Sequence, residues 1–245
     1  MAHREYIRET DNHKLAFLFI HGIVGTPDHF NSIIDIIPDE FSIYNILLDG
    51  HGKKIEDFAN TSMKKWEEQI DSITNYIFSK YEKIVIIGHS MGTLFAIDIA
   101  SRFPKRVEKL FLLAVPLTVF VKPIAVKSSI KAAFDKIDDK DELAVAMKNG
   151  AGVELEPKLW KYASWAPRFI ELLLKIKDTE NILEDLKVPT IAIQSKKDEL
   201  VTEKCFETLW LHPNIEAFMI NNSGHYFYSE KDLKIILKLF KDKIL

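Results

Sequence analysis

The 245-residue sequence predicts an α/β protein in which helices cover both faces of a mainly parallel sheet. The main observation is that short β-branched runs alternate along the chain with longer segments whose apolar residues have helical spacing. A second observation is that apolar residues make up 47% of the chain, which is enough for a sizeable core. In sheets of this kind, sites form at the carboxyl ends of the strands.

The elements of the first half begin with an apolar run of strand length. A strand is expected over residues 15–20, a helix over 27–37, a second strand over 41–48 and a helix over 61–81. Thr26 suits the N-cap of the first helix and Pro27 its first position, where no N–H is needed. The second strand ends at a glycine-rich turn, and apolar residues at helical spacing from Trp66 to Phe78 indicate the longer helix.

Two further strands surround the most informative turn of the chain. The apolar run at 83–87 predicts one strand, helical spacing predicts a helix over 94–103, and a strand is expected over 107–115. After residue 187 the alternation resumes, with a strand at 188–194, a helix at 202–211, a strand at 215–220 and a helix at 230–240.

Residues 117–187 interrupt the alternation. They contain no convincing strand, they read as several helices, and Gly150 and Gly152 mark a break that could be a hinge or a loop of fixed shape. An insertion of about 70 residues is too long for an ordinary connection. We therefore expect a core made of residues 1–116 and 188–245, with 117–187 as a helical cap over the carboxyl edge of the sheet.

Composition and charge exclude several classes of protein. The formal net charge of −3 argues against a nucleic-acid-binding surface, which would be strongly basic. The single cysteine, Cys205, excludes an internal disulfide and fits a reducing compartment. The N-terminus is too polar for a signal peptide, and no apolar run approaches the roughly 20 residues that span a bilayer. We expect a soluble, cytoplasmic protein without a metal-ligand cluster.

The segment Gly88-His89-Ser90-Met91-Gly92 lies between a predicted strand and a predicted helix. A serine hydroxyl is a poor nucleophile unless its geometry and a nearby base activate it. The two glycines remove side chains that would clash in a sharp turn, so Ser90 is expected to stand above the sheet edge as a nucleophile. The alternative, an ordinary turn with a serine N-cap, does not explain the glycines or the partners downstream.

Asp198 and His225 each follow a predicted strand, and the order Ser, Asp, His suits this kind of sheet. His225 would act as general base and acid toward Ser90, while Asp198 would orient the imidazole. Glu199 is adjacent to Asp198 and is the alternative acid. The backbone N–H groups of Met91 and Ile23 are expected to bind the oxyanion.

Other polar and aromatic residues near these motifs have simpler interpretations. His21 and His51 are expected to hold the shapes of their loops. His89 is expected to pack inside the turn formed by residues 88–92, which we call the elbow turn. In the cap, four candidates for substrate contact are Trp160, Trp165, Phe169 and Leu173. Aromatics at helical spacing more often simply pack a cap onto a core, and the apolar run around Phe169 also suits a membrane-surface or dimer contact.

These motifs together resemble the α/β-hydrolase superfamily, and most closely its small bacterial serine carboxylesterases and monoacylglycerol-lipase-like enzymes. The matching pieces are His21-Gly22, Asp49-Gly50-His51-Gly52, Gly88 to Gly92, Asp198 with Val201, and Gly224-His225. The resemblance implies a cap after the sixth strand of the family fold, and ester hydrolysis without a metal or organic cofactor. The antiparallel N-terminal hairpin of larger members is expected to be missing or reduced. The Asp49 loop lacks the arginine or proline of many relatives, so no subgroup's substrate is carried over.

The leading hypothesis is a serine hydrolase whose partner is a small-molecule ester, with a short-to-medium acyl chain or a monoacylglycerol. The same triad could act on a thioester, an amide or a carbon–carbon bond beside a ketone. A third hypothesis is a non-catalytic ligand-binding relative. Haloalkane dehalogenation is disfavoured because it needs a carboxylate at position 90. The sequence does not indicate an oligomeric state.

Overall fold

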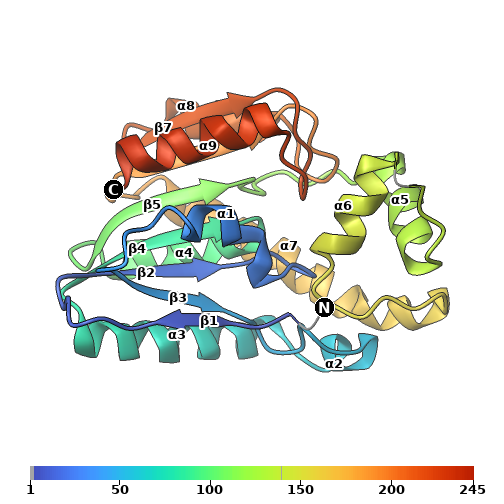
Figure 1. Cartoon of the computed structure of the whole chain (residues 1–245), viewed down its shortest axis with the longest axis horizontal. Helices are drawn as coiled ribbons and strands as arrows, with labels where there is room; N and C mark the ends of the chain where they lie inside the picture. The colour runs from blue at the N-terminus through green and yellow to red at the C-terminus, as the bar shows by residue number, and fades with distance from the viewer. Residues whose placement is uncertain (1–2, 139) are drawn as a thin grey trace.

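The structure is a computed structural model that describes residues 3–138 and 140–245. Met1, Ala2 and Asp139, which belong to the expected core and cap, lie outside the described residues. Within the described ranges, one sheet has the strand order β1-β3-β2-β4-β5-β6-β7 (Figure 1). Its strands are β1 Tyr6–Arg8, β2 Leu15–Ile20, β3 Ser42–Ile46, β4 Lys83–His89, β5 Val107–Leu113, β6 Thr190–Ser195 and β7 Ile215–Ile220.

All neighbouring strands in this sheet are parallel except β1 and β3, which are antiparallel. The predicted α/β fold with a mainly parallel sheet is therefore confirmed. The strand β1 is only three residues long, so the N-terminal antiparallel part is reduced, as expected. It was not among the predicted strands, because three partly exposed residues leave no clear apolar pattern.

Helices follow most of the strands. Outside residues 117–187 they are η1 Pro27–Phe30, α1 Asn31–Ile34, α2 Ile55–Ala59, α3 Met63–Lys80, α4 Met91–Arg102, α8 Lys204–Leu211 and α9 Glu230–Lys243. The predicted helix at 27–37 is shorter and begins as a 3₁₀ turn, although Thr26 caps it by accepting from the N–H of Asp28 at 3.3 Å. The short helix α2 was not predicted.

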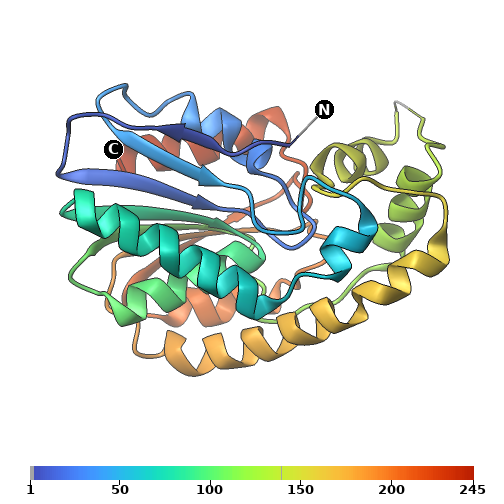
Figure 2. The same cartoon turned by 90° about the horizontal axis from the view of Figure 1, so that it is seen from below.

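Two apolar layers lie on opposite faces of the sheet because successive strand residues point to opposite sides. On β2, Phe17 and Phe19 pack with α1 and α9, through residues such as Phe240. Leu18 and Ile20 pack on the other face with α3, α4 and α8. Figure 2 shows helices of both layers, with α9 (red) on one side of the strands and α3 (teal) on the other.

The chain between β5 and β6 is helical in the described residues. It contains α5 Pro123–Ala133, α6 Glu142–Gly150, η2 Leu159–Trp165 and α7 Ala166–Leu183. In Figure 1, α5 and α6 lie beyond the arrowheads of the parallel strands, on the side where the carboxyl ends converge. The buried residues Leu172 and Ile176 of α7 belong to the core layer that contains α4.

Side chains at the start of α7 fasten this segment to the core. The indole Nε1 of Trp165 donates to the carbonyl of Ile55 at 3.1 Å. The Arg168 guanidinium donates to the carbonyl oxygens of Ala59 and Thr61. These bonds join the unpredicted helix α2 and the turn after it to the segment 117–187.

Gly152 fastens the middle of the segment through its main chain. Its N–H donates to the Val24 carbonyl at 2.7 Å, and its carbonyl accepts from the N–H of Gly52 at 2.6 Å. A Cβ at position 152 would overlap the carbonyl oxygen of Gly25. The absence of a side chain therefore permits a close approach of two backbones, which favours a fixed loop shape over a hinge.

The turn between β4 and α4 has the sharp geometry that its two glycines suggested. Ser90 has a φ of 51°, in the left-handed region that side chains rarely adopt. A Cβ on Gly88 would lie 2.8 Å from the main chain of Gly92, and a Cβ on Gly92 would overlap the carbonyl oxygen of Ile20. The helix α4 can therefore start directly against the end of β2.

The close contact between Gly92 and Ile20 predicts whether a substitution on α4 raises or lowers the free energy of unfolding. In a helix, replacing glycine by alanine ordinarily stabilises a protein by up to about 1 kcal/mol. Because a Cβ at position 92 would overlap the Ile20 carbonyl, Gly92→Ala should instead lower the free energy of unfolding by about 3 kcal/mol, the upper range for overpacking. Urea unfolding followed by circular dichroism measures the change.

Ser101→Ala, at a partly exposed position of the same helix, is the control and should change the free energy of unfolding by less than about 0.5 kcal/mol. A Gly92→Ala protein as stable as the wild type would contradict the tight contact between α4 and β2.

Candidate active site

Ser90 is held by its main chain, and its side chain is left uncommitted. Its N–H donates to the Leu113 carbonyl at 2.9 Å. Its carbonyl accepts from the N–H of Thr93 at 2.9 Å and from the Thr93 hydroxyl at 2.6 Å. Ser90 is 6% exposed. The backbone of the turn is thus fixed on both sides, while the hydroxyl takes part in none of the hydrogen bonds found among the described residues.

Asp198 and His225 are brought together by the turns after β6 and β7. The Nδ1–H of His225 donates to Oδ2 of Asp198 at 2.8 Å, and both side chains are buried. The other carboxylate oxygen, Oδ1, accepts from the N–H groups of Leu200 at 2.7 Å and Val201 at 2.8 Å. The carboxylate therefore fixes the tautomer in which Nε2 of His225 carries a free lone pair.

The two partners shift each other's pKa in opposite directions. Burial alone would lower the pKa of His225, but the charge of Asp198 and the hydrogen bond to it raise the pKa above its ordinary value. Burial alone would raise the pKa of Asp198, but the attraction of His225 and three hydrogen bonds lower it. The pair favours an ionised carboxylate that can stabilise a protonated imidazole.

The nucleophile candidate lies close to this pair but is not bonded to it. The ring of His89, the residue before Ser90, has its centroid 4.8 Å from that of His225. The hydrogen bonds of the described residues do not include one between Ser90 Oγ and His225 Nε2. Such bonds are often long before a substrate binds.

Two backbone N–H groups near Ser90 are available to a ligand. A Cβ on Gly22 would lie 2.8 Å from Cβ of Ser90, so the loop after β2 lies against the turn. This loop closes tightly, because the N–H of Gly25 donates to the Gly22 carbonyl at 3.0 Å. The N–H groups of Ile23, in this loop, and Met91, the first residue of α4, donate to none of the acceptors among the described residues.

His21 and His51 hold loops, as the sequence suggested. His21 accepts from the N–H of Leu48 at 3.1 Å through Nε2, and its Nδ1 lies 2.9 Å from the Gly22 carbonyl. Burial lowers the pKa of His21 to about 4, so the ring is neutral. His51 bonds the carbonyl oxygens of Leu48 and Asp49 through Nδ1.

A mainly apolar cavity of about 260 Å³ lies between the segment 117–187 and the core. Its lining residues are Ile23, Val24, Val121, Ser129, Ala132, Met147, Ala151, Leu155, Tyr162, Trp165, Phe169, Leu200 and Tyr226. It thus reaches the residue next to His225 and the loop with the free Ile23 N–H.

Two of the four cap candidates belong to this cavity. Trp165 and Phe169 line it, whereas Trp160 is 72% exposed, Leu173 is 58% exposed, and neither is part of the lining. The contribution of Tyr226 was not foreseen. Its only signal in the sequence is its position directly after His225.

A second, more polar hollow of about 500 Å³ adjoins the first. Its lining includes Asp28, His29, Glu142, Asn149 and Tyr228, and it shares Tyr226 with the apolar cavity. Tyr226, the residue after His225, therefore lines both an apolar space and a more polar one.

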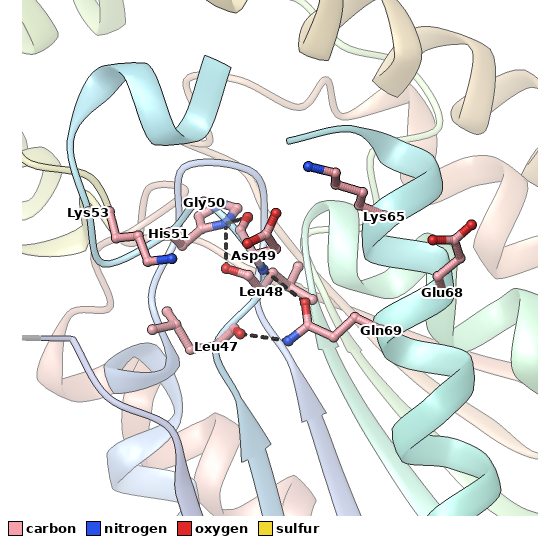
Figure 3. A pocket seen from close by; sticks show the side chains of 9 residues that line it. All are labelled: Leu47, Leu48, Asp49, Gly50, His51, Lys53, Lys65, Glu68 and Gln69. Carbon is pink, nitrogen blue, oxygen red and sulfur yellow. Dashed lines mark hydrogen bonds between the residues drawn. The ribbon is translucent and has the colours of Figure 1, made fainter. Parts of the chain in front are cut away.

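A third hollow, of about 560 Å³, lies elsewhere, between the Asp49 loop and α3 (Figure 3). Its lining residues lie at 47–53 and on α3, and none of them is a sequence neighbour of Ser90, Asp198 or His225, whereas Tyr226 lines both hollows described above. Figure 3 shows Gln69 bridging the loop: its Nε2 donates to the Leu47 carbonyl at 2.9 Å and its Oε1 accepts from the N–H of Asp49 at 2.8 Å. The two bonds of Gln69 support the Asp49 loop, and the hollow beside them is not part of the candidate active site.

Two further searches cover only the part of the chain that the structure describes. Among these residues, no group of three or more His, Cys, Asp or Glu is arranged to hold a metal ion. None of the helices there combines the length and the apolar character that crossing a membrane requires.

Known proteins with similar sequences or folds include several hydrolases. A Haemophilus influenzae protein named "Putative esterase/lipase" is 27% identical over 248 aligned residues, covering 93% of this chain and 83% of that protein. A solved structure from work on LipS and LipT, two metagenome-derived lipolytic enzymes, has a TM-score of 0.75 at 17% identity and covers 98% of this chain and 96% of that one. The monoacylglycerol lipase of Paleococcus ferrophilus has a TM-score of 0.67 at 15% identity, covering 99% of both chains.

The solved structures establish that the fold is similar, and the match to a protein family assigns the chain to that family. Residues 16–141, from β2 through the elbow turn to α5, match the alpha/beta hydrolase fold family. With this match and the sheet order described above, the chain belongs to the α/β-hydrolase fold family.

Proposed function

We propose that this protein is a serine hydrolase that cleaves carboxylic esters through an acyl-enzyme on Ser90. The observation that carries the proposal is the buried Asp198–His225 hydrogen bond of 2.8 Å, at the sheet edge where the strained Ser90 turn also lies. An ordinary serine N-cap would not need a left-handed φ, nor a paired acid and base beside it. The esterase/lipase name of the Haemophilus influenzae relative agrees with this proposal.

The proposed reaction has two halves. Ser90 Oγ attacks the ester carbonyl while His225 Nε2 takes its proton, and the resulting oxyanion accepts from the N–H groups of Ile23 and Met91. The intermediate then expels the alcohol, which receives the proton from His225. A water molecule next attacks the acyl-enzyme by the same steps, releasing the acid and restoring Ser90. Asp198 stays ionised and stabilises the imidazolium.

The two hollows beside Tyr226 suggest how the ester would lie. The apolar cavity, of about 260 Å³, would hold the acyl chain against Trp165 and Phe169. The more polar hollow would take the alcohol part. A medium-chain monoester of a small polar alcohol, such as a monoacylglycerol, fits this division.

Ser90→Ala should abolish hydrolysis of p-nitrophenyl butyrate, because no other group takes the role of the nucleophile. We expect kcat to fall by roughly 10⁵- to 10⁶-fold. The wild type should react covalently with a fluorophosphonate probe and Ser90→Ala should not, as read by mass spectrometry. Ser101→Ala is the matched control and should behave as the wild type.

Wild-type folded protein that the probe does not label would refute the serine-hydrolase proposal. If the butyrate ester were inert while its thioester or anilide turned over, the triad would stand and the ester assignment would be wrong.

The activity should rise with pH through the pKa of His225, because only the neutral imidazole can accept the serine proton. Asp198 raises that pKa. In Asp198→Asn its charge is gone and burial still lowers the pKa, so the acidic limb of kcat/KM should move to lower pH. The plateau should fall by about 10⁴-fold, because the amide no longer holds the right tautomer. An acidic limb that stays in place would exclude Asp198 as the partner of His225.

Ala132 of α5 lines the apolar cavity and is 4% exposed. Ala132→Phe should fill part of the cavity and shorten the acyl chain that fits. We expect kcat/KM for p-nitrophenyl octanoate to fall by more than about 10-fold, since several buried CH₂ groups would lose their contacts, while the acetate ester changes little. Ile124→Phe, at an exposed position of the same helix outside the lining, is the control. Equal effects on both esters would exclude this cavity as the acyl site.

A further inference from the structure

The main chain of His225 is held at both ends by buried side chains that the reaction above does not use. Oε2 of Glu199 accepts from the N–H of His225 at 3.0 Å. Nε2 of His89 lies 3.0 Å from the carbonyl oxygen of His225 and must donate, because a carbonyl only accepts. Glu199 is 2% exposed and His89 is 1% exposed.

Glu199 and His89 are the sequence neighbours of the two other candidates of the triad, Asp198 and Ser90. His89 precedes Ser90, and Glu199 follows Asp198. The turn that contains Ser90 is therefore linked by a hydrogen bond to the carbonyl of His225, and the turn that contains Asp198 is linked by another to the His225 N–H. Two short covalent links and two hydrogen bonds connect the nucleophile, the acid and the base.

The residues packed around His89 and Glu199 hold the first in its neutral form and allow the second to approach His225 closely. Burial and neighbouring histidines hold the pKa of His89 well below its ordinary value, so the ring is neutral. It packs against the tilted ring of His29, with the two centroids 3.9 Å apart. Gly224 lets the acid approach, because a Cβ there would lie 2.6 Å from Oε2 of Glu199. The second oxygen of Glu199, Oε1, is buried and has no hydrogen-bond partner among the described residues.

We propose that Glu199 and His89 are positioning residues that hold the main chain of His225 so that Nε2 points at Ser90, an inference that rests on the proposed ester hydrolysis. Asp198 fixes the ring at one atom only, and within the loop the N–H of Gly224 donates to the Phe227 carbonyl at 2.9 Å. The contacts from Glu199 and His89 hold the two peptide units that flank His225 itself. Displacement of a catalytic group by about 1 Å can cost about 100-fold in rate.

Glu199 would also act through its charge. The groups around His225 are Asp198 and Glu199 after β6, the neutral rings of His89 and His29, and the phenols of Tyr226 and Tyr228, whose pKa values are raised by burial. Burial raises the pKa of Glu199, while its hydrogen bond from the His225 N–H and the charge of His225 lower it. In their ionised forms, only the two carboxylates favour a protonated His225. Replacing Glu199 by glutamine removes one of these charges and keeps an oxygen that can accept from the His225 N–H.

Two substitutions at Glu199 separate the contact from the charge. Glu199→Ala should lower kcat for p-nitrophenyl butyrate by roughly 10- to 100-fold with KM nearly unchanged, because the substrate still binds while the base is misplaced. Glu199→Gln should restore most of kcat, and both variants should move the acidic limb of the pH profile to lower pH. Glu203→Ala, at an exposed acid on the following turn, is the matched control.

The other contact is tested independently. His89→Phe keeps a ring but loses the donor and should lower kcat with KM unchanged, whereas His89→Gln, which presents an N–H at similar reach, should retain more activity. Active sites counted with a fluorophosphonate probe correct every rate for misfolded protein. Should Glu199→Ala fail to fold, the pH shift of Glu199→Gln and the two His89 variants decide.

Three results would overturn the inference. The first is a kcat equal to that of the wild type in both Glu199→Ala and His89→Phe, and the second is a rise in KM with kcat unchanged in these variants. The third is an acidic limb of the pH profile that Glu199→Gln leaves in place. These failures differ from failure of the proposed function, in which the wild-type protein itself would neither react with the probe nor hydrolyse the ester.

Discussion

The contact between Gly92 and the end of β2 is the constraint on which the rest of the site depends. Because no side chain separates them, α4 begins directly over the carboxyl end of the neighbouring strand. This forces the chain at Ser90 into a left-handed turn and places the N–H of Met91 at the start of a helix. It also brings the loop after β2 against Ser90, so that Gly22 and the Ile23 N–H come with it. One close packing contact thus assembles groups from two separate strands.

Burial acts very differently on the histidines around this turn. His21, His51 and His89 are buried and His29 is partly buried, and desolvation lowers the pKa values of all four, so they serve as neutral rings that form hydrogen bonds or pack against other rings. His225 is equally buried, yet its pKa is raised, because it alone bonds a carboxylate. The chemistry of the site is therefore set less by residue type than by the placement of negative charge.

Local patterns predicted much of the fold, and long-range contacts explain what they missed. The strands at 15–20 and 215–220 agree with β2 and β7 residue for residue, because compact apolar runs leave little freedom in where a buried strand ends. The Ser90 turn and the Asp198–His225 pairing followed from strand ends meeting at one edge. The strand β1 and the helix α2 were missed because they are short and depend on neighbours for their stability. Helical spacing shows that α7 has an apolar face, but it does not reveal that Phe169 meets the cavity while Leu173 faces solvent.

Gly152 joins three parts of the chain in one seam of main-chain hydrogen bonds: the loop that contains Ile23, the loop at 52–53 and the segment 117–187. Val24 is the neighbour of Ile23, so the backbone next to the free Ile23 N–H is tied to the middle of the segment 117–187. A side chain at position 152 would overlap the Gly25 carbonyl oxygen and part these strands of backbone. The shape of the loop beside Ser90 therefore depends on a residue about 60 positions away that contributes only main-chain atoms.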